Sequence, residues 1–236
     1  MLRYNFILYL LSPFIILKLL YYTIKNNSGI SYLLKRLLGS TIKNNKSIWI
    51  HASSVGETKI ALEVLKKLYE LGHKDILITT STPSSKQIID TVSMCEINHL
   101  YIPFDFYFTM KRFVRNISPK LLIIIETEIW PNLYNQCKKG GSKIIIINAR
   151  LNPNRSLLQN IIKDIYTKTL QSVDGIYCKS KKDYEVFSEY VNKEKIKNLG
   201  NIKYSLLNEN NNPHRIIDRK YVLLASSHHR EEIIII

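Results

Sequence analysis

The chain has 236 residues with 34 basic and 19 acidic side chains, so its formal net charge is +15 and its length allows about one domain and part of a second. Hydrophobic residues make up 45% and charged residues 22% of the sequence, which does not fit a wholly disordered, collagen-like or multi-span membrane chain. The three cysteines lie far apart without a C-x-x-C pair, which argues against a disulfide framework or a cysteine zinc site.

An apolar run from Phe6 to Tyr22 begins the chain and is interrupted only by Ser12, Pro13 and Lys18. At about 1.5 Å per residue, a helix over this run would cover most of a hydrocarbon layer about 30 Å thick. No small-residue cleavage site follows the run, so we expect residues 1–24 to stay attached as a membrane anchor. The proline and the lysine leave open an interfacial helix that lies among the lipid headgroups.

Basic residues are more numerous after the apolar run than before it. Only Arg3 precedes the run. By the positive-inside rule, we expect the bulk of the chain to lie in the cytoplasm. The basic residues that follow the run are Lys25, Lys35, Arg36, Lys43 and Lys46.

Short apolar runs alternate with amphipathic stretches after a linker at 41–46. Continuous apolar runs such as LLIIIE and KIIIIN are typical of a parallel sheet covered by helices on both faces, so the predicted fold class is α/β. In such sheets ligands bind beyond the carboxyl ends of the strands. The expected strands are 47–51, 75–80, 99–103, 120–126, 143–148 and 175–179, and the expected helices are 57–71, 108–117, 130–139 and 156–170.

The composition changes towards the end of the sequence. The string NENNN at 208–212 precedes Pro213, so we place a linker at 208–219. An apolar strand begins at Tyr221, and the chain stops at Ile236. We interpret 25–207 as the first lobe and 220–236 as the opening of a second domain that this chain does not contain.

The first expected strand leads into HASSVGE, where a helix begins. Ser53, Ser54 and Gly56 permit a tight turn, and N–H groups at the start of a helix can hold an oxyanion. Glu57 is a candidate general base in the favourable field of the helix N-terminus. The alternative is an acidic first-turn residue that only stabilises the helix. No dinucleotide-binding G-x-G-x-x-G and no P-loop motif is present.

A second polar cluster follows the strand at 120–126. Glu126 and Glu128 lie two residues apart, so on an extended backbone both would face the same side. Two carboxylates at the end of an apolar strand are costly unless they are paired or functional. Arg150, which closes the next strand, could bind an anionic group or pair with either glutamate. We expect Glu57, Glu128 and Arg150 to gather at one end of the sheet.

We expect three further residues near these strands to have structural rather than catalytic roles. His51 at a strand end is more typical of a hydrogen-bonded structural histidine than of a catalyst, and we interpret Trp49 and Trp130 as packing residues.

Six strings in this sequence together resemble the 3-deoxy-D-manno-octulosonic acid (Kdo) transferases of lipopolysaccharide synthesis, whose N-terminal membrane anchor also matches. Any one of the strings would be weak, but six in the same order are specific. They are WIHASSVGE (49–57), TSTP (80–83), IPFDF (102–106), SPKLLIIIETEIWPNL (118–133), INARL (147–151) and GNIKY (200–204).

The resemblance implies a two-lobed GT-B glycosyltransferase that acts without a metal or other cofactor. Its N-terminal lobe would bind the lipid A precursor at the inner membrane, its C-terminal lobe would bind CMP-Kdo, and the sugar would be transferred with inversion. In the family, the glutamate of the SVGE motif is the candidate base, and it corresponds to Glu57. The glutamate before WPN corresponds to Glu128. The candidate residues for binding the acceptor or its anionic group are Ser53, Ser54, Gly56 and Arg150.

The sequence also departs from the family pattern. Ser84 and Ser85 follow the T-P pair, and SSHHREE carries Arg230 where the family has glycine. Because the chain ends there, we expect the nucleotide-sugar lobe to be mostly missing. The chain would then be a truncated product, half of a split enzyme that needs a separate C-terminal lobe, or a remnant without catalysis.

We therefore expect the N-terminal portion of a Kdo transferase that is inactive alone. The alternative is a non-catalytic, membrane-anchored module that binds lipid A or another acidic partner. A net charge of +15 also suits nucleic acid, but the basic residues are scattered and an anchor has no role in such a protein, so we expect no nucleic-acid partner.

Overall fold

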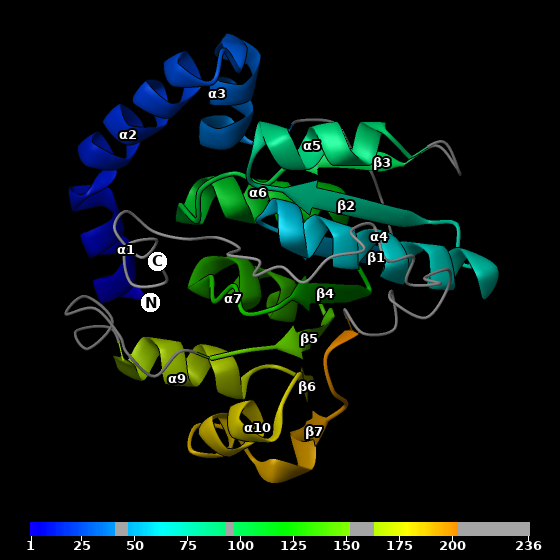
Figure 1. Cartoon of the computed structure of the whole chain (residues 1–236). Helices are drawn as coiled ribbons and strands as arrows, with labels where there is room; N and C mark the ends of the chain where they lie inside the picture. The colour runs from blue at the N-terminus through cyan, green and yellow to red at the C-terminus, as the bar shows by residue number, and fades with distance from the viewer. Residues whose placement is uncertain (41–46, 93–96, 152–162, 203–236) are drawn as a thin grey trace, which may run out of the picture. The chain divides into compact units, whose positions relative to one another are not determined.

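The computed structural model describes residues 1–40, 47–92, 97–151 and 163–202. Within these residues, a seven-stranded, fully parallel sheet has the order β3-β2-β1-β4-β5-β6-β7 (Figure 1). The predicted α/β fold with a parallel sheet is confirmed. The strands are β1 (Ile48–Ala52), β2 (Ile76–Thr80), β3 (Asn98–Tyr101), β4 (Leu121–Ile125), β5 (Lys143–Ala149), β6 (Gly175–Cys178) and β7 (Ile196–Asn198).

Side chains that alternate along each strand enter two cores, one on each face of the sheet. In β1, Ile48 and Ile50 enter the core shared with helices α4 and α5, whereas Trp49 enters the core shared with α6, α7, α9 and α10. Burial on both faces explains why these strands are continuously apolar. These helices are α4 (Val55–Glu70), α5 (Pro83–Asp90), α6 (Tyr107–Ile117), α7 (Pro131–Lys139), α9 (Lys163–Gln171) and α10 (Lys181–Ser188).

The predicted strands lie within about two residues of the observed ones. Helices α5 and α10 and strand β7, which follows the short 3-10 helix η1 (Lys193–Lys195), were not predicted. The first part of the helix expected over 156–170 lies outside the described residues, as do the linkers at 41–46 and 208–219 and the segment 220–236.

The N-terminal apolar run does not form the single helix expected over 6–22. It forms α1 (Leu2–Leu10) and α2 (Ser12–Lys25), which are bent by 54°. Pro13 has no N–H group for the helix ladder, and Ser12 Oγ donates to Tyr9 O at 2.7 Å, so the ladder is interrupted at this point. No single helix in the described residues is long and apolar enough to cross a bilayer, and only this bent pair passes by length and composition.

A third N-terminal helix, α3 (Gly29–Leu38), connects this pair to the lobe. It ends at Gly39, whose φ of 72° suits glycine and whose missing Cβ leaves room for Pro103 and Phe113. Arg36 Nη1 donates to Ile102 O, and Phe104 N–H donates to Arg36 O at 2.9 Å. The IPFDF segment therefore holds the end of α3.

Candidate active site

The carboxyl ends of β1 and β4 form the point at which the strand order reverses. From β1 the chain passes through α4 to β2 on one side, whereas from β4 it passes through α7 to β5 on the other. Open α/β sheets bind ligands at such a switch point. The segment with Glu57 follows β1 and the segment with Glu128 follows β4, so the predicted meeting of these two glutamates at one edge is confirmed.

Glu57 is held by the first turn of α4 and is only 9% exposed. Its Oε2 accepts from Ser53 N–H at 2.7 Å, and its Oε1 accepts from the Ser54 hydroxyl at 2.8 Å. Ser54, the N-cap, in turn accepts from Glu57 N–H at 3.4 Å. This arrangement is close to a capping box, so Glu57 does stabilise the helix start. Gly56, in the same turn, is half-buried.

The pKa of Glu57 is raised above its ordinary value. Burial is the largest cause, and the negative charges of Glu128 and Glu126 raise it further. The hydrogen bonds from Ser54 and Ser53 act in the opposite direction because they favour the charged form. A carboxylate with a raised pKa is a better proton acceptor near neutral pH.

Glu128 is half-buried and is oriented by the start of α7. Its Oε2 accepts from Trp130 Nε1–H at 2.6 Å, and its backbone oxygen accepts from the Tyr134 hydroxyl at 2.9 Å. The expectation that Trp130 only packs was incomplete, because its indole N–H also holds a candidate site residue.

The strand expected over 120–126 does not include Glu126, so the extended backbone on which Glu126 and Glu128 would face the same side is interrupted. Strand β4 ends at Ile125, and Glu126 has a φ of 59°, which is uncommon for a residue other than glycine. Asn148, in the neighbouring strand, has a φ of 53°. Backbone strain of this kind is concentrated at functional sites.

Arg150 follows β5 at the same edge, as predicted. Its backbone N–H donates to Thr127 Oγ1 at 3.1 Å, while its side chain is exposed. Among the ion pairs between described residues, none joins Arg150 to Glu128. An exposed guanidinium can bind an anionic group with two hydrogen bonds.

His51 is fully buried, and both ring nitrogens have partners. Nδ1 lies 2.9 Å from Thr79 Oγ1 and Nε2 lies 3.2 Å from Ser53 Oγ. Burial, with a smaller effect of Arg36, lowers the pKa of His51 to about 3, so the ring is neutral. Trp49, also fully buried, donates to Thr79 Oγ1 at 2.8 Å. These contacts agree with the structural interpretation of both residues.

Two buried charged residues near this edge were not predicted from the sequence. Arg36 is 5% exposed, its guanidinium lies 4.6 Å from the Phe104 ring centroid, and the charge of Glu128 acts on its pKa. Asp105 is also 5% exposed. Arg36 was noted only as a flanking basic residue, and the only signal for Asp105 was its place in IPFDF. Among the described residues, no cluster of three or more His, Cys, Asp or Glu side chains could hold a metal ion.

Comparison with solved structures shows the fold. A crystal structure of UDP-N-acetylglucosamine 2-epimerase matches with a TM-score of 0.51 and 14% identity, covering 68% of this chain and 47% of that protein. A putative UDP-N-acetylglucosamine 2-epimerase from Listeria monocytogenes matches with a TM-score of 0.50 and 13% identity, covering 71% and 50%. At this identity the likeness supports the Rossmann-like GT-B lobe and nothing about activity.

Curated relatives are much more similar in sequence. The 3-deoxy-D-manno-octulosonic acid transferase of Haemophilus influenzae is 33% identical over 205 residues, which cover 81% of this chain and 47% of that protein. The enzyme of the same name from Rickettsia prowazekii is 30% identical over 197 residues, covering 80% and 42%. A bifunctional glycosyltransferase/methyltransferase of Fusobacterium nucleatum is 34% identical over 170 residues, covering 71% and 27%.

The chain thus spans less than half of the length of each of these relatives. The profile of the family described as 3-deoxy-D-manno-octulosonic-acid transferase (kdotransferase) matches residues 32–206, which is most of the chain. The chain therefore belongs to the Kdo transferase family and carries its N-terminal domain.

Proposed function

We propose that this lobe binds the lipid A precursor and that Glu57 removes the proton from the acceptor hydroxyl that attacks CMP-Kdo. The observation that carries the proposal is a buried carboxylate at the switch point of the sheet, with a pKa raised by burial and by Glu128. The acceptor oxygen forms a bond to the anomeric carbon as the bond from that carbon to the CMP phosphate breaks. The hydroxyl proton goes to Glu57, and the anomeric configuration is inverted.

The surrounding residues support this assignment. Ser53 and Ser54 occupy one lone pair on each Glu57 oxygen, and a carboxylate has about four such sites, so an acceptor hydroxyl can still be bound. Arg150 is exposed at the same edge and can bind a phosphate of the acceptor with two hydrogen bonds. Glu128 raises the pKa of Glu57 and thereby makes it a stronger base.

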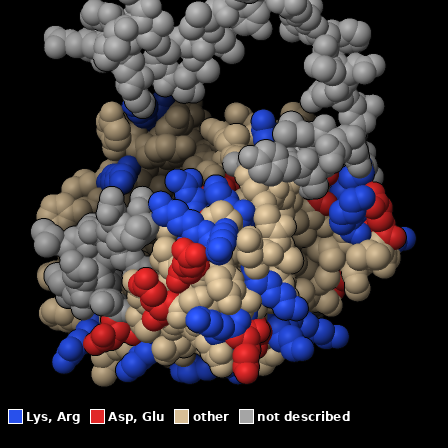
Figure 2. All heavy atoms as spheres, turned by 60° about the horizontal axis from the view of Figure 1, so that its bottom comes forward, with Lys and Arg blue, Asp and Glu red and all other residues tan. Residues whose placement is uncertain are grey.

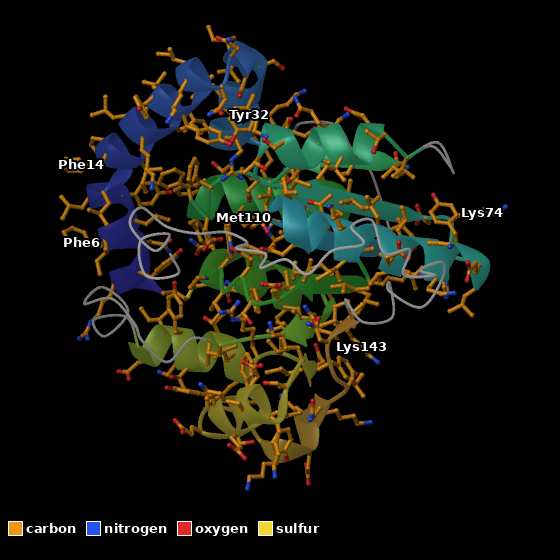
Figure 3. All side chains as sticks on the ribbon, viewed as in Figure 1. Phe6, Phe14, Tyr32, Lys74, Met110 and Lys143 are labelled. Carbon is orange, nitrogen blue, oxygen red and sulfur yellow. The ribbon has the colours of Figure 1, made fainter. Side chains whose placement is uncertain are left out.

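We further propose that α1 and α2 bind the membrane as interfacial helices, which lie among the lipid headgroups rather than cross the bilayer. An apolar stripe at spacings of three or four residues follows both helices on their exposed side, and Figure 3 shows Phe6 and Phe14 pointing away from the sheet. Basic residues flank the stripe at Arg3, Lys18 and Lys25 and suit anionic headgroups. The stripe consists of Leu2, Phe6, Leu10, Phe14, Leu17, Tyr21 and Ile24, which are between 63% and 88% exposed.

On one face of the lobe the charges are mixed rather than uniformly basic. Figure 2 shows basic side chains interspersed with acidic ones on the face that carries α10 and β7. A surface ion pair joins Lys138 Nζ to Asp174 Oδ2 at 2.9 Å. Mixed charges do not produce the continuous basic field that binding to nucleic acid requires.

The proposal predicts that the 236 residues, produced alone, bind the lipid A precursor but do not transfer Kdo to it. A GT-B donor site needs a second lobe to enclose the nucleotide and to exclude water. The purified chain should bind lipid A precursor in calorimetric titrations. It should transfer Kdo from a CMP-Kdo generating system only when a C-terminal lobe, such as that of the Haemophilus influenzae relative, is added.

In this reconstituted assay, Glu57→Gln should lower the transfer rate by about 10²- to 10⁴-fold and leave acceptor binding nearly unchanged. Glu63→Gln, on the same helix, is the matched control and should retain activity. Transfer by the 236 residues alone would contradict the need for a second lobe. Binding without transfer, even when the added lobe binds donor, would favour the non-catalytic module.

A further inference from the structure

Asp105 is a buried carboxylate that caps a helix from a distant part of the chain. Its Oδ2 accepts from Asn132 N–H at 2.8 Å, and its Oδ1 accepts from Leu133 N–H at 2.9 Å. Both donors belong to the first turn of α7, where N–H groups have no partner within the helix. Trp130, the N-cap of α7, makes no side-chain capping hydrogen bond, so Asp105 supplies this function.

The N-terminal helix α1 reaches the same carboxylate. The Tyr4 hydroxyl donates to Asp105 Oδ2 at 2.9 Å, and Asn5 Oδ1 accepts from Asn132 Nδ2 at 2.7 Å. The Tyr9 ring stacks on Phe106, with centroids 5.4 Å apart and an interplanar angle of 24°. Helix α1 therefore contacts the first turn of α7 and the segment at 105–106 at three points.

The N-terminal end of α7 also supplies both hydrogen bonds that orient Glu128. Trp130 immediately precedes the helix and donates to the Glu128 carboxylate, while Tyr134 lies one turn later and donates to the Glu128 backbone oxygen. Any change in the position of this end of the helix therefore moves the two donors that hold Glu128.

We propose that Asp105 is a positioning residue that couples the membrane-binding helix α1 to Glu128. Tyr4 and Asn5 fix the first turn of α7 through Asp105 and Asn132, and this turn fixes Glu128 through Trp130 and Tyr134. The inference rests on the proposed function for the role of Glu128 and for the binding of α1 to lipid. It implies that deleting residues 1–24 disturbs the site, rather than only releasing the lobe from the membrane.

The two tryptophans of the chain allow a direct test by NMR of the full chain in detergent. Each indole N–H has a hydrogen-bond partner, Glu128 for Trp130 and Thr79 for Trp49, so the second resonance is an internal reference. Trp130→Phe assigns the two signals. The test variants are Tyr4→Phe, which removes only the hydroxyl, and Asp105→Asn. Tyr9→Phe is the matched control, because the Tyr9 hydroxyl has no hydrogen bond to the described residues.

We expect Tyr4→Phe to shift the Trp130 indole signal and to accelerate hydrogen exchange of the Asn132 and Leu133 amides about tenfold. Asp105→Asn should do so more strongly, while Tyr9→Phe and the Trp49 signal should show no change. Unchanged exchange in Tyr4→Phe, or faster amide exchange with an unchanged Trp130 signal, would overturn the coupling. An equal change at Trp49 would overturn it too, since that would indicate general loosening.

This measurement needs neither donor nor acceptor, so it can fail or succeed independently of the proposed reaction. In the reconstituted transfer assay, Tyr4→Phe should lower kcat severalfold with little change in KM for the acceptor. A normal kcat together with a shifted Trp130 signal would overturn the positioning role while leaving the role of Glu57 intact.

Discussion

Glu57 both caps a helix and is a candidate base, and the two roles have opposite effects on its pKa. The hydrogen bonds from Ser53 and Ser54 that make it a good cap favour the carboxylate and lower the pKa. Burial and the charge of Glu128 raise the pKa and make it a better base. The helix-capping and catalytic interpretations are therefore compatible, because the same atoms can fulfil both.

This balance predicts that two substitutions shift the pKa of Glu57 in opposite directions. Ser54→Ala removes a hydrogen bond to the carboxylate and should raise the pKa, and it should also destabilise the helix by about 1 kcal/mol. Glu128→Gln removes a negative charge and should lower the pKa. The Glu57 carboxyl signal, followed by ¹³C NMR against pH, measures both effects. Glu63→Gln is the control and should cause no shift. Shifts of the same sign in the two variants would contradict this account.

At the residue scale, the sequence could reveal Glu57, Glu128 and Arg150 because each follows an apolar strand. The sequence could not reveal Asp105, because the residues that donate hydrogen bonds to Asp105 lie far from it in the chain. Its contact with Tyr4 spans 101 residues. A single sequence contains no local pattern that indicates such a contact, and the same holds for the packing of Arg36 on Phe104.

At the scale of elements, the buried strands and the longer helices were predictable from their apolar periodicity. Strand β7 has three residues and helices α5 and α10 have eight each, which is too short for a periodic pattern to be distinct. The bend in the N-terminal run could be inferred from Pro13, but the docking of α1 on α7 could not. It depends on Tyr4 and Asn5, which stand before the apolar run.

The proposed binding of the stripe on α1 and α2 to lipid predicts which substitution should weaken it. Leu17→Glu places a charge in the stripe and should reduce binding to anionic vesicles about tenfold or more, because it removes about 1.5–3 kcal/mol of apolar burial and adds repulsion. Leu71→Glu is the matched control, since Leu71 is 74% exposed at the end of α4, outside the stripe. Vesicle flotation measures both. Equal binding of Leu17→Glu and the unaltered chain would contradict the interfacial role of the stripe.

At the scale of the whole lobe, the sheet order locates the site more sharply than the sequence did. The apolar strands predicted a parallel sheet, but they did not predict its strand order. In this order β2 and β3 are added on one side of β1, and the direction then reverses so that β4 to β7 are added on the other side. This reversal places β1 beside β4 and so brings the Glu57 and Glu128 segments together. The order results from packing across the whole sheet, which no local segment determines.

The stability of the lobe should depend on pH through two buried groups with opposite effects. Burial lowers the pKa of His51 from 6.5 to about 3, so between these values only the unfolded chain binds the proton, and stability falls as the pH falls. Burial raises the pKa of Asp105 from 3.8 to about 7, so between these values only the folded chain binds the proton, and stability rises as the pH falls.

Two variants separate these effects in urea unfolding measured between pH 6.5 and pH 4.5. His51→Gln removes the first effect, so the stability advantage of the unaltered chain over this variant should shrink as the pH falls. Asp105→Asn removes the second effect, so the corresponding advantage should grow as the pH falls. Each slope should be at most about 1.4 kcal/mol per pH unit, the value for one proton. Two slopes of the same sign would show that one of these groups is not held in the protonation state that its burial implies.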